Sequence, residues 1–346
     1  MQVIASAPGK LVLLGEYAVL EGAPALVMAV NRRAHVTLTE TRGERIAVSA
    51  PVLGIVAECR LRAGGKVKWL GDARLSDQLR LVTAVLEDNM TAGVSRAFRA
   101  ELDTDGFFLD AHGIRAKLGL GSSAALTVAL AGALCVMQGR PALGVDGLVA
   151  LHRRMQDGRG SGLDIAAARQ GGVVIYRLCS GVPESLPVWL PQGLEWCAVW
   201  SGKPAVTGEF LRHIADWAVR EPQRYNAIVA RLQAVAAAGA DAIQRADAGA
   251  LMQAAKDYAA GLAELGTASG MDIVSREHRE IANAAAACGV AYKSCGAGGG
   301  DAGIALSLDH DRLADFRQRI VQAGFRILDL EVDPQGLEAR ITNEHQ

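Results

Sequence analysis

The chain has 346 residues, 50% of them hydrophobic, which is enough for a large core and longer than one core usually supports. Its formal net charge of −1 excludes the basic field that non-specific nucleic-acid binding requires. It contains no apolar run of about 18 residues, the length that marks a membrane span, and its first residues lack the pattern of a signal peptide. We therefore expect a cytoplasmic monomer or homodimer with no nucleic-acid and no membrane partner.

The cysteines form no CxxC pair and stand mostly in apolar contexts, which favours reduced core residues over a metal site or a disulfide framework. They are Cys59, Cys135, Cys179, Cys197, Cys288 and Cys295.

The beginning of the chain is strand-rich. Residues 3–5 and 10–14 indicate two strands separated by a break at Pro8-Gly9, and residues 34–39 alternate apolar and polar side chains. Apolar residues recur at helical spacing in residues 76–100, which predicts a helix there. These elements indicate an extended N-terminal sheet with helical cover.

The middle of the chain contains a predicted buried helix and a predicted boundary. Residues 126–137 are apolar on every side, as expected of a buried helix that the preceding glycine-rich segment caps. Residues 171–176 indicate a strand. The connection after it contains Pro183, Pro187 and Pro191, and this favours a domain boundary there. We expect an N-terminal domain over residues 1–182 and a C-terminal domain over residues 183–346.

The C-terminal half combines helices and strands, and the whole chain therefore has an α+β pattern. Residues 227–265 are alanine-rich and predict helices broken near Gly239 and Gly249. Further expected elements are strands at residues 289–293 and 303–308, a helix at residues 311–323 and a terminal stretch at residues 326–332.

The segment Gly-Leu-Gly-Ser-Ser-Ala-Ala at residues 119–125 has the character of a phosphate-binding loop. Backbone N–H groups at the start of the following helix would face an anion, and the helix dipole adds partial positive charge. Ser122 and Ser123 supply hydroxyls for Mg²⁺ or a phosphate oxygen, and Lys117 supplies a cation. Two alternatives remain: close helix packing, and a G-x-G-x-x-A dinucleotide fingerprint, which lacks its ribose-binding acid here.

Three further segments carry candidate chemistry. Lys10 follows a Pro-Gly turn, where it is either a surface lysine or a phosphate ligand. Asp164 falls in the first turn of a predicted helix, where its carboxylate either stabilises the helix by interacting with the helix dipole or takes part in catalysis. The Gly-Ala-Gly-Gly-Gly-Asp run at residues 296–301 has more glycine than a simple turn needs, which favours close approach of a ligand.

Taken together, residues 8–17, 117–125 and 294–301 resemble the three motifs of the GHMP small-molecule kinases, in the same order over nearly the whole chain. The resemblance implies an N-terminal domain with the fold of ribosomal protein S5 domain 2 and a ferredoxin-like C-terminal domain. It also implies that ATP, with Mg²⁺, and the acceptor meet in the cleft between them.

By the same resemblance, Lys10 and Asp164 face the transferred phosphoryl group as catalytic residues, and Ser122 or Ser123 holds Mg²⁺. The ATP-binding set is Lys117, Gly119, Leu120, Gly121, Ser122, Ser123 and Ala124. The substrate-binding set is Lys10, Tyr17, Ser161, Gly162, Lys203, Ser294, Gly298, Gly299, Gly300 and Asp301.

Within the superfamily, Tyr17, the segment at residues 160–164 and Asp301 resemble the phosphomevalonate kinases, which implies transfer from ATP to 5-phosphomevalonate in isoprenoid synthesis. Pro204 and Val206 depart from that family's substrate segment. Mevalonate kinase or another small-alcohol or sugar kinase is the alternative, and a Rossmann-type oxidoreductase or a non-catalytic nucleotide-binding protein is the alternative from another class.

The identity of the acceptor determines the role expected of Asp164. An alcohol acceptor would use this carboxylate as a general base. A phosphate monoester, whose second pKa is about 6, is already mostly dianionic, and Asp164 would then orient Lys10 or the metal. Two dianionic reactants also require further cations, for which the candidates are Lys203, Lys293, Arg154 and Arg159.

Overall fold

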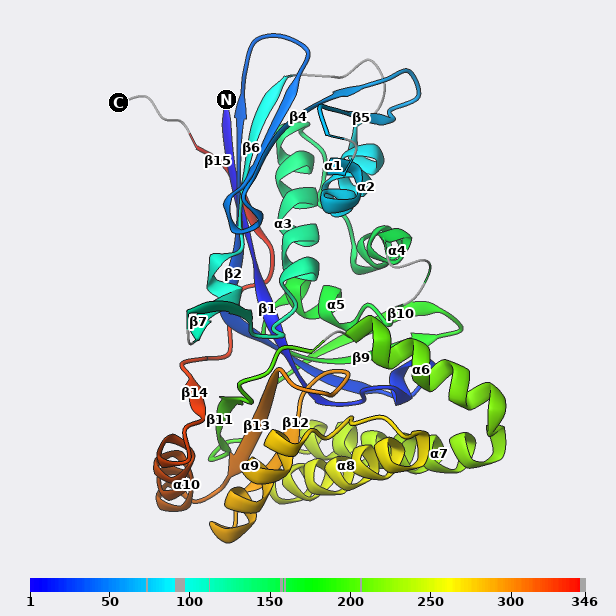
Figure 1. Cartoon of the computed structure of the whole chain (residues 1–346), viewed down its shortest axis with the longest axis vertical. Helices are drawn as coiled ribbons and strands as arrows, with labels where there is room; N and C mark the ends of the chain where they lie inside the picture. The colour runs from blue at the N-terminus through cyan, green and yellow to red at the C-terminus, as the bar shows by residue number, and fades with distance from the viewer. Residues whose placement is uncertain are drawn as a thin grey trace.

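The computed structural model describes residues 1–72, 74–90, 97–111, 113–155, 158, 160–205 and 207–342. Within these ranges the strands form a nine-stranded sheet, a four-stranded sheet and a two-stranded ribbon. Figure 1 shows the larger sheet at the top with helices along one face, and the smaller sheet and the longest helices below it. The α+β class predicted from the sequence is confirmed.

The larger sheet runs in the order β10-β9-β2-β6-β3-β4-β5, and β1 pairs with β2 and with β15. Its strands are β1 (Gln2–Leu14), β2 (Ala25–Glu40), β3 (Ile46–Ala50), β4 (Ile55–Leu61), β5 (Val67–Leu70), β6 (Phe98–Asp103), β9 (Val173–Cys179), β10 (Val182–Val188) and β15 (Glu338–Thr342).

The break expected at Pro8-Gly9 does not divide β1, which runs unbroken from Gln2 to Leu14. The pairing with β2 shifts register between Pro8 and Gly9 instead, and this irregularity accommodates the proline. The missing side chain of Gly9 allows the backbone of Leu120 to approach, and Lys10 N donates to Leu120 O at 2.8 Å. The start of β1 is therefore tied to the segment that precedes α3.

In the described part of the chain, five α-helices accompany the larger sheet: α1 (Leu75–Gln78), α2 (Arg80–Asn89), α3 (Ser122–Met137), α4 (Val145–Met155) and α5 (Leu163–Gln170). The buried helix predicted from residues 126–137 is confirmed as α3. The helix predicted over residues 76–100 is wrong at its end, because Phe98 begins β6. Side chains alternate between buried and exposed along β6, and this period of two identifies a strand.

The proline-rich connection is not a linker, because Val182–Val188 forms β10 and pairs with β9. Pro183 and Pro187 fit there because β10 is an edge strand, where a missing N–H costs no hydrogen bond to a neighbour. The expected boundary after residue 182 falls inside this hairpin, and the change from one sheet to the other comes between Val188 and Glu195.

The smaller sheet has the order β12-β13-β11-β14. Its strands are β11 (Glu195–Trp200), β12 (Ala291–Ser294), β13 (Ala302–Ser307) and β14 (Arg326–Leu328), and the ribbon is β7 (Phe108–Ala111) with β8 (Ile114–Lys117). The helices of this half are α6 (Thr207–Arg220), α7 (Pro222–Gln244), α8 (Ala248–Ser269), α9 (Arg276–Ala287) and α10 (His310–Gln322). Within the described ranges, no helix is long and apolar enough to cross a membrane.

The helix break expected near Gly239 is wrong, since this residue lies inside α7, whereas the break expected near Gly249 is confirmed, since α7 ends at Gln244 and α8 begins at Ala248. Gly239 packs directly on Leu14 of β1, where a side chain would overlap, and Asp247 caps the second helix by accepting from Ala250 N. Glycine therefore serves close packing at residue 239, and the chain turns at residues 245–247, just before Gly249.

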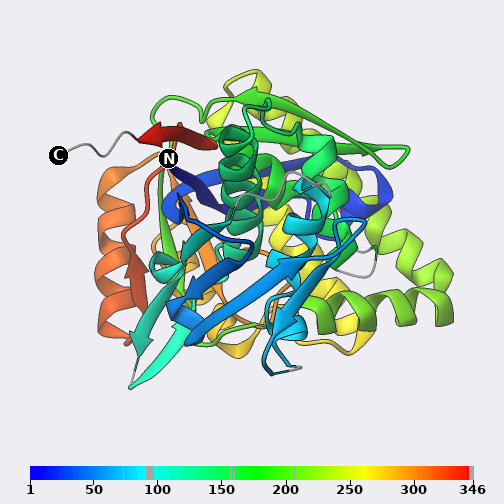
Figure 2. The same cartoon turned by 90° about the horizontal axis from the view of Figure 1, so that it is seen from above.

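The last strand, β15, returns to the first sheet and pairs with β1 beside the N-terminus, as Figures 1 and 2 show. One apolar core joins both sheets, since Leu14 of β1, Ala198 of β11 and Leu262 of α8 belong to the same buried cluster. The cysteines of the described chain are unpaired, and Cys179 is the exposed one among them, against the expectation for the group.

Candidate active site

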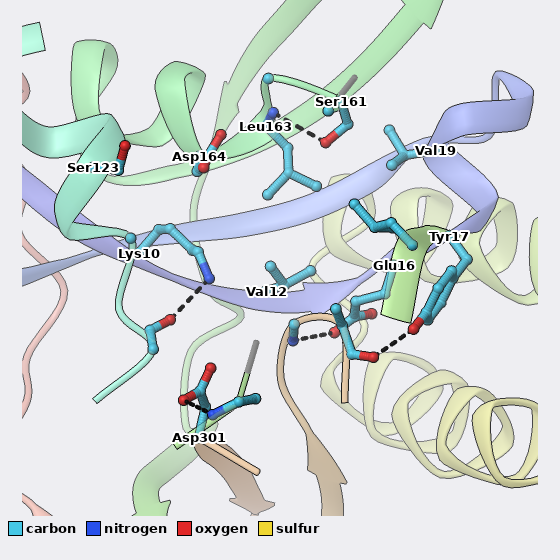
Figure 3. A pocket seen from close by; sticks show the side chains of 18 of the residues that line it. Lys10, Val12, Glu16, Tyr17, Val19, Ser123, Ser161, Leu163, Asp164 and Asp301 are labelled. Atoms are coloured by element: carbon cyan, nitrogen blue, oxygen red, sulfur yellow. Dashed lines mark hydrogen bonds between the residues drawn. The ribbon is translucent and has the colours of Figure 1, made fainter. Parts of the chain in front are cut away.

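A cavity of 410 Å³ lies where the end of β1, the start of α3, the start of α5 and the loop after β12 meet (Figure 3). The sequence-predicted residues that line it are Lys10, Tyr17, Lys117, Gly119, Gly121, Ser123, Ser161, Gly162, Asp164 and Asp301. Distant segments of the chain thus converge on one space.

The glycine-rich segment before α3 leaves backbone donors at the helix start. Gly121 is the N-cap with a φ of 79°, no side chain caps the helix, and Ala125 N donates to Gly121 O at 3.1 Å. The N–H groups of Ser122 to Ala124 therefore have no acceptor within the helix. This end of α3 can bind an anion through backbone donors and the helix dipole.

Lys10 extends from β1 into the space between the helix starts and Asp301 (Figure 3). Its Nζ donates to Gly119 O at 3.1 Å, and its aliphatic chain lies close to the α-carbon of Gly121. The ammonium is thus held at the glycine-rich segment before α3 by a carbonyl oxygen that leaves its other donors available. Leu120 and Ala124 are buried behind the loop.

Asp301 contacts the same loop from the other half of the chain. A β-carbon on Gly119 would overlap the Asp301 carboxyl group, and Asp301 Oδ1 accepts from Ala205 N at 3.0 Å. Burial raises the pKa of Asp301, while the Ala205 N–H, Lys10 and Lys117 oppose that shift. Burial lowers the pKa of Lys117, Asp301 opposes this, and the like charge of Lys10 adds to it. The charges of Asp301, Lys10 and Lys117 are therefore close enough to interact electrostatically with one another.

Ser123 and His152 are hydrogen-bonded to each other on the cavity wall. Ser123 Oγ lies 3.2 Å from His152 Nε2, and the imidazole is buried. Ser122, the other candidate metal ligand, is buried and does not belong to the described lining. Within the described residues no cluster of three metal-binding side chains occurs. A Mg²⁺ ion held mainly by substrate phosphates, together with the Ser123 hydroxyl and the Asp164 carboxylate, fits this arrangement.

Asp164 lies in the first turn of α5, as predicted, with Gly162 as the N-cap. Its Oδ1 accepts from Ile165 N at 3.0 Å, and the side chain lines the cavity. The preceding loop is fixed by Tyr176, whose hydroxyl donates to Ser161 O at 2.5 Å. The carboxylate therefore projects from a well-anchored turn on the same side of the cavity as Ser123 (Figure 3).

The residues after β1 are joined to the loop after β12. Lys293 Nζ donates to Glu16 Oε1 at 2.5 Å, both side chains are almost fully buried, and Gly296 N also donates to this oxygen at 3.2 Å. Tyr17, whose φ is 63°, donates from its hydroxyl to Ala297 O. Burial and the charge of Glu16 raise the pKa of Tyr17, so its hydroxyl stays protonated.

Other predicted substrate residues of the glycine-rich loop lie against protein and do not appear in the described cavity lining. Gly298 packs on Ile273, Gly299 on the ring of Phe210, and Gly300 on the Lys203 carbonyl. Ser294 is buried, and its carbonyl accepts from Lys293 at 2.7 Å. In the structure, close approach by the protein's own backbone and rings accounts for these glycines.

Those of the proposed extra cations that the structure describes, Lys293, Arg154 and Lys203, do not gather at the cavity. Lys293 is buried in its pair with Glu16, and exposed Arg154 pairs with Asp88. The Lys203 side chain is exposed, and the cavity lining as described does not include it. Arg159 lies outside the described residues.

Several residues that line the cavity are absent from the sets of site residues predicted from the sequence. They are Glu16, His152, Ala205, Leu211, Gly296 and Ala297. Glu16 and Gly296 stand inside the quoted motifs, so the motif positions could have indicated them. His152 and Leu211 lie on amphipathic helices, where nothing local distinguishes a lining residue from a core residue.

No protein-family model matches the chain. The phosphomevalonate kinase of Streptomyces sp. (strain CL190) is 29% identical over 96% of this chain and 97% of its own. The mevalonate kinase of Aeropyrum pernix is 30% identical over 98% of this chain and 96% of its own. The chain belongs to the GHMP kinase superfamily. This GHMP kinase is accordingly a phosphotransferase, and the oxidoreductase alternative is wrong.

A solved structure gives the same fold. Streptococcus pneumoniae phosphomevalonate kinase, in complex with phosphomevalonate and AMPPNP, superposes with a TM-score of 0.75 at 20% identity over 95% of this chain and 99% of that one. The fold also excludes the dinucleotide-fingerprint alternative, since the strand before α3 in this GHMP kinase belongs to an antiparallel ribbon and not to a parallel βαβ unit.

Proposed function

We propose that this GHMP kinase transfers the γ-phosphoryl group of ATP to 5-phosphomevalonate, giving 5-diphosphomevalonate and ADP. The observation that carries the proposal is the convergence of Lys10, Asp164 and the start of α3 on one cavity. The similarity to the Streptomyces phosphomevalonate kinase over nearly both whole chains supports this acceptor.

The proposed roles follow from charge and hydrogen bonding. The backbone donors at Ser122, Ser123 and Ala124 bind the nucleotide phosphates, and Lys117 adds a cation at the same loop. Lys10 neutralises charge that develops on the transferred group, and a preorganised donor in this role typically contributes about 10²–10³ in rate. Mg²⁺, which Ser123 and Asp164 are proposed to hold together with the phosphates, supplies further charge neutralisation when bound.

With a phosphate acceptor, no proton has to be removed before attack, because a phosphate monoester is mostly dianionic at neutral pH. Asp164 then acts by orienting Lys10 and the metal. Tyr17, Ser161, Gly162 and Asp301, which line the same cavity, are proposed to contact the acceptor.

Mevalonate is the second candidate acceptor, and the similarity to the Aeropyrum pernix mevalonate kinase favours it. With this alcohol, Asp164 would accept the hydroxyl proton as a general base. The described cavity lining also places two cations, Lys10 and Lys117, among three acidic residues, Glu16, Asp164 and Asp301. The side chains therefore supply no excess positive charge, which favours the acceptor that carries less negative charge.

The deciding experiment measures ADP release with mevalonate, 5-phosphomevalonate and galactose side by side. The proposal expects turnover with 5-phosphomevalonate and a kcat/KM at least about tenfold lower with the others, because a phosphate-binding site discriminates strongly against acceptors that lack the group. Turnover with mevalonate and none with its phosphate would replace the acceptor and leave the phosphotransferase assignment intact.

A further inference from the structure

His278 is a buried histidine outside the cavity that bonds to the backbone of the glycine-rich loop. It lies in the first turn of α9, where Ser275 caps the helix by accepting from His278 N at 3.3 Å. The side chain is 0% exposed. Its Nδ1 lies 2.8 Å from the Tyr292 hydroxyl, and its Nε2 lies 2.8 Å from the carbonyl oxygen of Gly300.

These two contacts define the tautomer of the neutral ring. A carbonyl oxygen accepts hydrogen bonds and cannot donate, so Nε2 of His278 must carry the proton that it shares with Gly300. Nδ1 is then unprotonated, and the Tyr292 hydroxyl donates to it. The hydrogen bonds therefore run in one direction, from Tyr292 through the imidazole to Gly300.

The peptide group between Gly300 and Asp301 is held on both of its sides. His278 donates to its carbonyl oxygen, and its N–H donates to Lys203 O at 2.7 Å. The next carbonyl, of Asp301, accepts from Ser201 N at 2.9 Å. Because both flanking peptide planes are fixed, the backbone of Asp301 is held at its φ of 62°, a region that side chains rarely adopt.

This backbone geometry determines the direction in which the Asp301 carboxylate leaves the chain. The carboxylate lies against Gly119 of the phosphate loop and interacts with Lys10 and Lys117. A rotation of the Gly300–Asp301 peptide would turn the carboxylate away from these cations.

We propose that His278 is a positioning residue of the phosphoryl-transfer site, and that its neutral Nε2–H form holds the Gly300–Asp301 peptide and thereby the Asp301 carboxylate beside Lys10 and Lys117. The inference rests on the proposed use of this cavity for phosphoryl transfer and is independent of which acceptor is used.

Protonation of His278 would turn Nδ1 into a donor, so the Tyr292 hydroxyl could no longer donate to it and would have to accept instead. Burial lowers the pKa of His278, the hydrogen bond to Gly300 opposes this, Lys293 on β12 adds to it, and Glu277 and Asp272 oppose it. Since the pKa in the folded state lies below the unfolded value of about 6.5, the folded ring is neutral above that pH and becomes protonated only as the pH falls through the lowered folded-state pKa.

The kinetic test compares three substitutions with wild type between pH 5.5 and 8. His278→Phe removes the donor, and we expect kcat to fall about tenfold with a smaller change in KM for ATP. His278→Gln keeps an N–H that reaches Gly300 and does not titrate, so it should retain most of the activity at pH 7.5 and lose the acid transition of kcat. Tyr292→Phe removes the bond that favours the neutral ring, and its acid transition should move to higher pH.

The exposed His310 provides the matched control, and His310→Gln should change neither kcat nor the pH profile. Wild-type kinetics in folded His278→Phe would overturn the proposal.

A spectroscopic readout separates this proposal from the question of the acceptor. In wild-type protein labelled with ¹⁵N-histidine, we expect the resonance that disappears in His278→Gln to have a protonated Nε2 and an unprotonated Nδ1. An Nδ1–H tautomer would overturn the proposal even if every variant fails to fold well enough for kinetics. Absence of turnover with 5-phosphomevalonate would instead contradict the proposed acceptor and leave the tautomer result unaffected.

Discussion

Lys10 is the residue on which the proposed chemistry depends most directly. Its ammonium donates to Gly119 O while its backbone N–H donates to Leu120 O, so both ends of the residue are tied to the glycine-rich segment before α3. We expect Lys10→Met to lower kcat by about 10²–10³, because a preorganised charge at the transition state is removed. The coupled ADP-release assay measures kcat, and thermal unfolding reports on the fold.

The control is Lys68→Met on the exposed face of β5, which should leave both kcat and the melting temperature unchanged. Activity within a few-fold of wild type in Lys10→Met would show that this lysine is ordinary surface.

Two non-glycine residues with positive φ line the cavity, Tyr17 at 63° and Asp301 at 62°. A bulky residue in this conformation costs about 1–3 kcal/mol and persists only where the surroundings hold it. Tyr17 is held by its hydrogen bond to Ala297, and Asp301 by backbone bonds to Lys203 and Ser201. The backbone strain of these two residues thus coincides with the proposed site.

At the scale of elements, the start of α3 requires glycine for conformation and for space. Gly119 has a φ of 75°, and a β-carbon there would overlap Asp301. We expect Gly119→Ala to weaken ATP binding at least tenfold, because the clash displaces either the loop or the carboxylate. Calorimetric titration with ATP measures the effect.

Gly139, just past the other end of α3, is a matched control because it has a φ of 65° and open space around its α-carbon. Gly139→Ala carries the conformational cost of about 1–2 kcal/mol in stability without the clash, and ATP affinity should stay unchanged. Equal losses of affinity in both variants would mean that the conformation of Gly119, and not its contact with Asp301, matters.

Elements with local signals were predicted correctly, and elements that depend on distant partners were not. The apolar residues 126–137 after a glycine-rich start predict α3, and Asp164 was placed correctly in the first turn of α5. The sequence does not predict β10 or β15. The prolines in β10 argue against a strand, and β15 has only a weak alternating pattern, so it is their pairing with β9 and with β1 that makes them strands.

The same distinction applies to the candidate site. The phosphate loop and Lys10 stand in short motifs that the sequence displays. The pairing of Glu16 with Lys293 joins residues 277 positions apart, and no local pattern indicates it. The sequence therefore suggests Lys293 as a cation for the substrate, although in the fold this lysine is buried in an ion pair with Glu16.

At the scale of the whole molecule, one set of polar contacts joins the N-terminal β1 to the C-terminal half. Lys293 donates to Glu16 Oε1 and to Val12 O, and the Tyr258 hydroxyl donates to Glu16 O at 2.7 Å. These contacts lie directly beneath the cavity wall formed by Glu16, Gly296 and Ala297. Stability and the shape of the site therefore depend on the same buried ion pair.

We expect Lys293→Met to lower the free energy of unfolding by about 3–5 kcal/mol, because it leaves the Glu16 carboxylate buried without its cation. Adding Glu16→Gln removes that charge, so the double variant should recover much of the loss. Urea unfolding measures all of these variants. Arg276→Met, which breaks the exposed pair with Glu280, is the control and should change stability little. A double variant as unstable as Lys293→Met would show that Lys293 matters through its bonds to Val12 and Ser294, and not through neutralising Glu16.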